Sequence, residues 1–246
     1  MGIGEAIAKS FADAGASLIL SGRDLARLEA AQARIGHTDR TMPVVCDVRD
    51  RQQVLKLAQT AVERFKKIDV WVNNAGHGLL DSVAEMNDAA FREMFDTNFF
   101  GTVAGMQAAI AVMKTQAAGT IINISSVAGH IPLPFHAGYS ATKFAMNAIG
   151  KAANVELKNS GIRVLTVCPG YVQTAFSDNV ALGTERKRVR PRRVHGITAG
   201  RVAKATMRGY LNGQSEVIVP WTMHIPVKIY QMFPWLVEWS MGRMAK

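Results

Sequence analysis

The sequence has little cysteine and no long uninterrupted apolar run. Its two cysteines, Cys46 and Cys168, each lie inside an apolar segment without a second cysteine or histidine at the spacing of metal ligands. We therefore expect two small core residues, with no disulfide framework and no metal site. The chain also lacks the roughly 18-residue apolar run that spans a bilayer and the features of a secretory signal. These absences predict a cytoplasmic protein.

The composition is that of one compact domain with an excess of positive charge. The chain has 246 residues, of which 48% are apolar and 20% are charged, and this length is sufficient to bury one large core. Lysine and arginine number 29 against 19 acidic residues, which gives a formal net charge of +10. A field of this sign attracts anionic partners at long range, such as a phosphate-bearing cofactor, lipid headgroups or nucleic acid.

Short apolar runs alternate with longer segments of helical periodicity along the whole chain. This pattern predicts a single α/β domain, a doubly wound parallel sheet of the Rossmann type with its ligand at the carboxyl ends of the strands. We expect the dinucleotide-binding domain over residues 1–220 and an aromatic-rich tail over 221–246. Helices are expected to begin near Ile3, Asp24, Asp50, Asp88, Tyr139 and Thr198. The predicted strands are Ala16–Ser21, Met42–Cys46, Ile68–Val72, Gly119–Ile124, Ile162–Val167 and Glu216–Val219.

The N-terminus begins with a glycine pair and no preceding strand. A dinucleotide-binding turn needs a strand, a glycine for the sharp turn, a second for close approach to the pyrophosphate and a third for helix packing. Gly2 and Gly4 can supply only the later two. The first strand is therefore missing from this chain. We expect Met1 to be an internal methionine and an upstream segment to supply the missing strand and glycine.

Five further motifs follow in order, most of them directly after a predicted strand. A tyrosine four residues before a lysine is a weak signal alone, whereas the ordered set at strand ends is a strong one. The motifs are Ser21-Gly22-Arg23-Asp24, Cys46-Asp47-Val48, Asn73-Asn74-Ala75-Gly76, Ser125-Ser126 with Tyr139 to Lys143, and Pro169-Gly170 with Thr174.

With these motifs, residues 1 to about 220 resemble the short-chain dehydrogenase/reductase family. The resemblance implies an oxidoreductase that interconverts a carbonyl compound and an alcohol and forms a homodimer or homotetramer. It also implies a catalytic set of Asn98, Ser126, Tyr139 and Lys143, with a helix kink at Asn98 and a water that links the lysine to solvent. The cofactor contacts that it implies are Gly2, Ile3, Gly4, Arg23, Asp47, Val48, Asn74, Ala75, Gly76, Tyr139, Lys143, Pro169, Gly170 and Thr174, with Asn73 in the same loop.

Physical chemistry agrees with these roles. A phenol with a pKa of about 10 is a poor acid at neutral pH, but a nearby ammonium lowers that pKa. Residues four apart share a helix face, so Lys143 is expected to lower the pKa of Tyr139 and to reach a ribose hydroxyl. Tyr139 would then give a proton to a carbonyl oxygen. Ser126, rather than Ser125, would hold that oxygen with a hydrogen bond.

The end of the Ala16–Ser21 strand decides the choice of cofactor. The position that would carry an acidic residue for the adenosine ribose is Gly22, and Arg23 follows it. Arginine suits phosphate oxygens, which favours NADP over NAD. Asp24 fits a helix cap better than a ribose ligand, although it leaves NAD open.

Two segments lie outside the shared motifs. Residues Glu185–His195 carry six basic residues against one acid, which fits a solvated loop or attraction of an anionic substrate or acidic lipid, whereas specific nucleic-acid binding is not expected. Residues Trp221–Lys246 contain three of the four tryptophans. This tail would suit a peripheral membrane contact, an apolar lid or a dimer interface, and it hints at a lipophilic substrate.

Two interpretations of the whole chain remain. The first is an NADP-dependent oxidoreductase acting on a small-molecule ketone, aldehyde or alcohol. The second is a catalytically idle scaffold or membrane-associated binding protein of the same fold, because the first strand and first glycine are missing.

Overall fold

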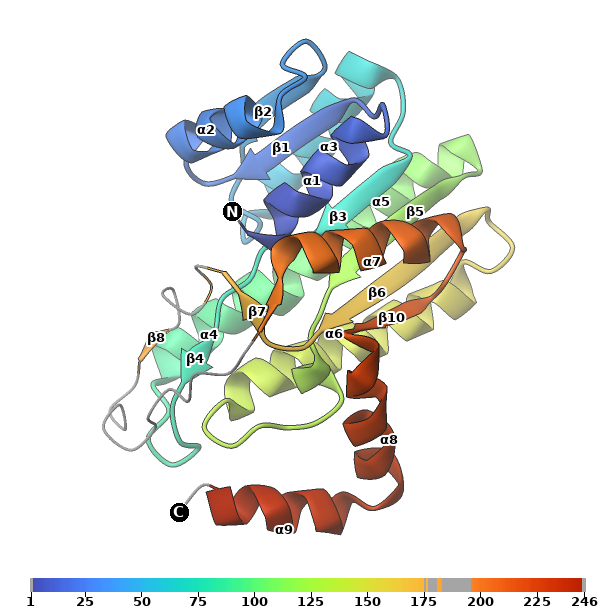
Figure 1. The fold of residues 1–246 in the computed structure, drawn as a ribbon. Coiled ribbons are helices and arrows are strands. Elements are labelled where there is room, and N and C mark those ends of the chain that lie inside the picture. Colours follow the sequence, from blue (N-terminus) through green and yellow to red (C-terminus); the bar gives the residue numbers. More distant parts are fainter. Residues whose placement is uncertain (1, 175, 177–180, 183–195, 245–246) are drawn as a thin grey trace.

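The computed structural model describes residues 2–174, 176, 181–182 and 196–244. The helices (Figure 1) are α1 (Ile3–Asp13), α2 (Leu25–Ile35), α3 (Arg51–Phe65), α4 (Asp88–Phe95), α5 (Gly101–Gln116), α6 (Ala137–Glu156), α7 (Ala199–Leu211), α8 (His224–Met232) and α9 (Pro234–Met244). The main strands are β1 (Leu18–Gly22), β2 (Thr41–Val45), β3 (Val70–Asn73), β5 (Gly119–Ile124), β6 (Ile162–Pro169) and β10 (Glu216–Val219). Two-residue strands pair as β4 (Leu79–Leu80) with β8 (Ala181–Leu182) and as β7 (Val172–Gln173) with β9 (Ile197–Thr198).

The main strands are all parallel and form two sheets. Four strands pair in the order β10-β6-β5-β3, and the other two pair as β1-β2. In the part of the chain that the structure describes, β1 and β3 face each other (Figure 1) without a ladder between them. Their facing edges therefore carry backbone groups that a strand between them would pair.

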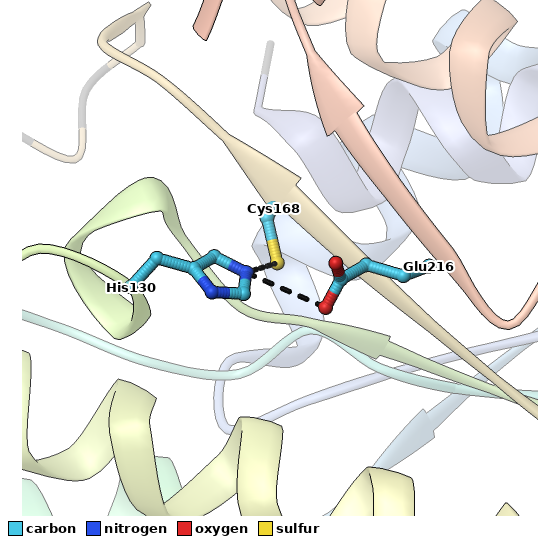
Figure 2. A group of neighbouring side chains, drawn as sticks. All are labelled: His130, Cys168 and Glu216. Atoms are coloured by element: carbon cyan, nitrogen blue, oxygen red, sulfur yellow. Dashed lines mark hydrogen bonds and ion pairs between the residues drawn. The ribbon is translucent and has the colours of Figure 1, made fainter. Parts of the chain in front are cut away.

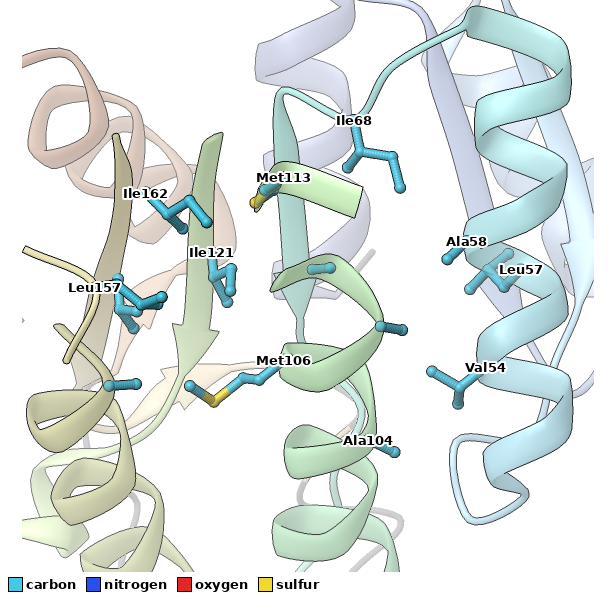
Figure 3. Packing of buried hydrophobic residues seen from close by; sticks show 14 of the residues in the cluster. Val54, Leu57, Ala58, Ile68, Ala104, Met106, Met113, Ile121, Leu157 and Ile162 are labelled. Carbon is cyan, nitrogen blue, oxygen red and sulfur yellow. The ribbon is translucent and has the colours of Figure 1, made fainter. Parts of the chain in front are cut away.

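Helices cover both faces of the sheets. On one face, α1 and α7 pack on each other and on β5 and β6 through a cluster that includes Phe11, Ile122, Leu165 and Val202. On the other face, α3, α5 and α6 enclose the cluster drawn in Figure 3, where Met106, Met113 and Ile121 lie between helix and strand. Residues of β5 alternate between the two clusters because successive strand side chains point to opposite faces.

The predicted strands and helices are confirmed with small shifts of their ends. Three of the predicted helix starts are side-chain caps, as Asp24 accepts from Arg27 N at 3.1 Å, Asp50 from Gln52 N at 2.9 Å and Thr198 from Arg201 N at 3.2 Å. The helix expected near Asp88 is capped instead by Asn87, and the helix expected near Tyr139 begins at Ala137.

The C-terminal tail folds as a 3₁₀ turn (Trp221–Met223) followed by α8 and α9. Val227 of α8 is buried in a small cluster with Cys168 and Ile218, whereas Trp221, Trp235 and Trp239 are 71%, 66% and 56% exposed. Among the described residues, no helix has the length and apolar character needed to cross a bilayer. The basic stretch Glu185–His195 lies outside the described residues.

Candidate active site

The ends of β5 and β6 meet at a serine pair. Ser126 follows β5, and its Oγ donates to the Pro169 carbonyl at 3.4 Å and accepts from Ala128 N at 3.1 Å, which caps a 3₁₀ turn (Val127–Gly129). Its neighbour Ser125 is 4% exposed, and its Oγ donates to Asn147 Oδ1 at 2.5 Å. The Ser125 hydroxyl is therefore buried and engaged in an internal hydrogen bond, whereas Ser126 is the more exposed of the two serines.

Helix α6 places Tyr139 and Lys143 on one face, one turn apart. Lys143 is 4% exposed, and its Nζ donates to the Ile124 carbonyl at 2.8 Å. The same Nζ lies 5.7 Å from the centroid of the Tyr139 ring. A hydrogen bond between the Ser126 and Tyr139 side chains acts to lower the pKa of the phenol. The structure therefore brings together Ser126, Tyr139 and Lys143, three of the four residues of the expected catalytic set.

Burial controls the protonation of this pair. Desolvation raises the pKa of Tyr139 to about 12, although the Ser126 hydrogen bond acts in the opposite direction. Desolvation also lowers the pKa of Lys143 to about 8. The expectation that Lys143 lowers the pKa of Tyr139 is therefore wrong for this structure, because burial dominates and the ammonium is directed at a backbone carbonyl. At neutral pH Tyr139 is a neutral phenol, which is the form that can donate a proton.

Asn98 lies fully buried in a π-helical turn (Asp96–Phe100) that joins α4 to α5. This turn is the helix irregularity that the family resemblance implies. The Asn98 amide binds the backbone of His77 in both directions, accepting from His77 N and donating to His77 O, each at 2.9 Å. Its Nδ2 also donates to Thr142 on α6 at 3.2 Å. Asn98 thus ties the loop after β3 to the helix that carries Lys143.

The loop after β3 comes close to Asn98 and Lys143 because it has a glycine, Gly76, at the point of approach. A Cβ on Gly76 would lie 3.0 Å from Asn98 Oδ1 and 3.8 Å from Lys143 Nζ. Asn73, the first residue of this motif, has a different role. Its Nδ2 donates to Asn123 Oδ1 at 2.8 Å and its Oδ1 accepts from Trp71 at 2.8 Å, so its side chain is used between the strands.

The N-terminal glycines lie against the same loop. A Cβ on Gly4 would be 2.6 Å from Asn74 Nδ2, and Gly2 is the N-cap of α1. A helix N-terminus with free backbone amides and no side chain in the way is suited to a pyrophosphate. Ile3 packs in the cluster beneath α1. This cradle fits the dinucleotide that the sequence motifs imply.

The ends of β1 and β2 carry the charged residues of the site. Arg49 donates to Asp47 at 2.6 Å and, with the charge of Arg23, lowers the pKa of the Asp47 carboxyl. Arg23 itself is exposed. Asp24 caps α2, as expected. Val48 packs closely against Gly101, because a Cβ added to that glycine would lie only 2.8 Å from the Val48 side chain.

The remaining motif residues lie beyond β6. Gly170 N donates to the Val219 carbonyl at 2.8 Å, which closes the end of β6 onto β10. Thr174 Oγ1 accepts from Phe176 N at 3.3 Å, and the Phe176 ring lies 5.7 Å from the ring of Tyr139. The aromatic cover over the phenol was not predicted, because sequence spacing does not reveal contacts between distant segments.

Sequence reasoning also missed Asn147. This residue is 5% exposed, accepts from Ser125 and donates from Nδ2 to the Gly129 carbonyl at 2.8 Å. It therefore fixes the serine turn to α6. The available signal was a polar residue four positions after Lys143, on the same buried helix face.

Comparisons with known proteins agree with this geometry. The sequence model of the short chain dehydrogenase family matches residues 1–184. An oxidoreductase of Staphylococcus epidermidis is 33% identical over 186 residues, which cover 76% of this chain and 80% of that protein. A short-chain dehydrogenase/reductase from Burkholderia phymatum in complex with NAD has a TM-score of 0.86 at 25% identity, covering 96% of this chain and 91% of that one. An alcohol dehydrogenase from Thermococcus sibiricus complexed with 5-hydroxy-NADP has a TM-score of 0.77 at 26% identity, covering 89% and 91%. The chain therefore belongs to the short-chain dehydrogenase/reductase family and is an NAD(P)-dependent oxidoreductase.

Proposed function

We propose that the protein interconverts a ketone or aldehyde and an alcohol, with Ser126, Tyr139 and Lys143 as its catalytic residues and NADP as its preferred cofactor. The observation that carries the proposal is the meeting of these three side chains at the ends of β5 and β6, with Lys143 buried behind the phenol.

Each side chain has a distinct task in carbonyl reduction. The bound cofactor supplies the hydride. Tyr139, a neutral phenol at neutral pH, donates its proton to the carbonyl oxygen. The Ser126 hydroxyl donates a hydrogen bond to that oxygen and stabilises the charge that develops on it. Lys143, buried behind the phenol with its Nζ on the Ile124 carbonyl, would hold a ribose hydroxyl of the bound cofactor. Asn98 is a positioning residue, because it holds the loop and the helix around the lysine.

Two observations support the preference for NADP. Arg23 is exposed at the end of β1 and contributes to the low pKa of Asp47, so its charge lies near the end of β2. Asp24 is engaged as the cap of α2 and forms an ion pair with Arg27 at 3.4 Å, which weakens it as a ribose ligand. An exposed guanidinium at this position suits a 2′-phosphate.

The surroundings of the phenol support an apolar substrate. Phe176 is 37% exposed and packs against Tyr139 at a tilt of 58° between the ring planes. An aromatic side chain beside the proton donor favours a hydrocarbon group next to the reacting carbonyl.

The protein is also proposed to act as a homodimer or homotetramer and to touch a membrane surface through its tail. The membrane contact is supported by the exposed apolar side chains on α8 and α9 and by Arg243, whose guanidinium lies 3.9 Å from the centroid of the Trp239 ring. Sedimentation with anionic lipid vesicles and size-exclusion chromatography separate a membrane contact from an interface between copies.

A cofactor oxidation assay tests the proposed reaction. NADPH and NADH are each offered with a panel of aliphatic and aromatic ketones and aldehydes, and oxidation is followed by absorbance. Carbonyl-dependent oxidation that is faster with NADPH supports the proposal. NADPH binding without oxidation across the whole panel would instead favour the scaffold interpretation.

A further inference from the structure

Three potential metal ligands from separate parts of the sequence meet beneath the serine turn. Figure 2 shows His130, which ends the 3₁₀ turn after Ser126, pointing at Cys168 of β6 and Glu216 of β10. The His130 ring nitrogen, the Cys168 sulfur and one Glu216 oxygen all lie within 4.8 Å of one another. None of the three takes part in the proposed proton transfer.

The distances match the edges of a tetrahedral coordination shell. His130 Nε2 lies 3.5 Å from Cys168 Sγ and 3.4 Å from Glu216 Oε1. Around a zinc ion with ordinary bond lengths, a nitrogen and a sulfur ligand stand about 3.5 Å apart, and a nitrogen and an oxygen ligand about 3.4 Å apart. The third edge, from the Cys168 sulfur to the Glu216 oxygen, is at most 4.8 Å long.

The same atoms lack hydrogen bonds of ordinary length. Glu216 Oε1 is buried and, among the described residues, accepts no hydrogen bond of good geometry, although His130 Nε2 and Lys151 Nζ each lie 3.4 Å away. Cys168 is fully buried, and its sulfur lies 3.5 Å from the His130 nitrogen and 3.8 Å from Asn147 Oδ1, with Ser125 as a further hydrogen-bonding neighbour. A buried carboxylate oxygen without a donor is costly. A cation at the centre of the three atoms would satisfy it.

The pairing of β6 with β10 places two of the three side chains on one face of the sheet. β6 and β10 pair in parallel, with Ile218 opposite Cys168 and Glu216 opposite Thr166, so the sulfur and the carboxylate share one sheet face. Two lysines are charged neighbours of the cluster: Lys143 acts electrostatically on Cys168, and Lys151 Nζ lies 3.4 Å from Glu216 Oε1. The Lys151 side chain is 60% exposed and is therefore able to turn away into solvent.

We propose that His130, Cys168 and Glu216 bind one divalent transition-metal ion, with zinc as the favoured ion and water as the fourth ligand. A thiolate, an imidazole and a carboxylate form a ligand set that suits zinc and excludes magnesium or calcium. The thiolate and the carboxylate together balance the charge of the ion. The ion would fix β6, β10 and the serine turn to one another and would not touch the reacting atoms.

Metal binding by the full chain without an affinity tag tests this site. Chelator-treated protein is titrated with Co²⁺, and the near-ultraviolet absorption of a cobalt–thiolate bond is recorded. Zinc content and the midpoint of thermal unfolding are then measured after dialysis against Zn²⁺. We expect one metal ion per chain, a cobalt–thiolate band and a higher unfolding midpoint with zinc. Absence of metal binding at micromolar Co²⁺ and Zn²⁺ would overturn the proposal.

Variants identify the ligands. Cys168→Ser should abolish the cobalt–thiolate band, whereas Cys46→Ser, at the other buried cysteine, should retain it. Glu216→Gln removes a partly exposed ligand and therefore tests the site even if Cys168→Ser fails to fold, and it should weaken zinc binding by at least about tenfold. Metal binding that is unchanged in Glu216→Gln, or a band that persists in Cys168→Ser, would also overturn the proposal.

Discussion

The four-stranded sheet and the two-stranded sheet, the two parts of the fold that carry the site, differ in how firmly they hold their site residues. In the four-stranded part, Ile121, Ile122 and Leu165 are at most 1% exposed. In the two-stranded part, Met42 and Val45 of β2 are 36% and 51% exposed. The first part carries the serine turn and lies against Tyr139 and Lys143, whereas the second carries Arg23 and Asp47.

The comparison teaches that chemistry and cofactor choice depend on different forces. The proposed catalytic side chains are held by a packed core and buried hydrogen bonds, so we expect them to be in position before any ligand binds. The residues at the adenosine end are held by surface ion pairs such as Asp47 with Arg49, which are individually weak. Substitutions in the first part should therefore alter rate, and those in the second should alter affinity.

If the four-stranded part holds the chemistry, the two adjacent serines should respond in opposite ways. Ser126→Ala removes the hydroxyl that would bind the carbonyl oxygen, so kcat should fall by roughly 10²- to 10³-fold, and loss of the cap on Ala128 N should lower the free energy of unfolding by about 0.5 to 1 kcal/mol. Ser125→Ala breaks a buried hydrogen bond to Asn147, so it should lower the free energy of unfolding by about 1 kcal/mol or more. Steady-state kinetics and urea denaturation distinguish the two, and equal loss of kcat in both variants would contradict the assignment.

If the two-stranded part selects the cofactor, Arg23→Gln should change the preference and leave kcat intact. Loss of a charge-assisted contact to the 2′-phosphate should raise KM for NADPH by roughly 10- to 100-fold, with little effect on KM for NADH. Arg27→Gln is the matched control, since Arg27 is exposed nearby but pairs with Asp24. An unchanged KM for NADPH in Arg23→Gln would show that Arg23 does not select the cofactor.

The buried lysine should cost stability. Burial lowers the pKa of Lys143 from 10.5 to about 8. At pH values between these two, the unfolded chain keeps the lysine proton and the folded chain has released it, so the stability of the wild type rises with pH in this range. Lys143→Met removes this group and should be more stable than wild type at about pH 7, by about 1 to 3 kcal/mol, although inactive. Urea denaturation should show the difference shrinking by about pH 9.5, and a difference that grows with pH would refute the sign.

The smallest expected effect concerns the approach of α1 to the loop after β3. A methyl group on Gly4 would press on Asn74 Nδ2 at 2.6 Å, and Asn74 is exposed and able to move. Gly4→Ala should therefore weaken NADPH binding several-fold and gain none of the roughly 0.5 to 1 kcal/mol that alanine gives a helix. Gly200→Ala in α7 meets nothing closer than 4.0 Å and should gain that stability with unchanged NADPH binding. Fluorescence titration and thermal unfolding of both variants make the comparison.

The sequence predicted most of the fold, because buried parallel strands are apolar runs and caps such as Asp50 mark the helix starts. It also predicted which side chains meet at the strand ends. It did not predict the direction of the Tyr139 pKa shift, because that direction depends on burial rather than on spacing. Nor did it find the His130, Cys168 and Glu216 cluster, whose members are far apart in sequence and are brought together by the pairing of β6 with β5 and with β10.

The central claim is that the Tyr139 phenol supplies the proton in the reaction. The direct measurement is a single-turnover assay of Tyr139→Phe with saturating NADPH and the best carbonyl substrate, alongside NADPH titration of the same variant. We predict that the variant binds NADPH as tightly as wild type and oxidises it at least about 10²-fold more slowly. Oxidation at the wild-type rate without that one hydroxyl would contradict the claim.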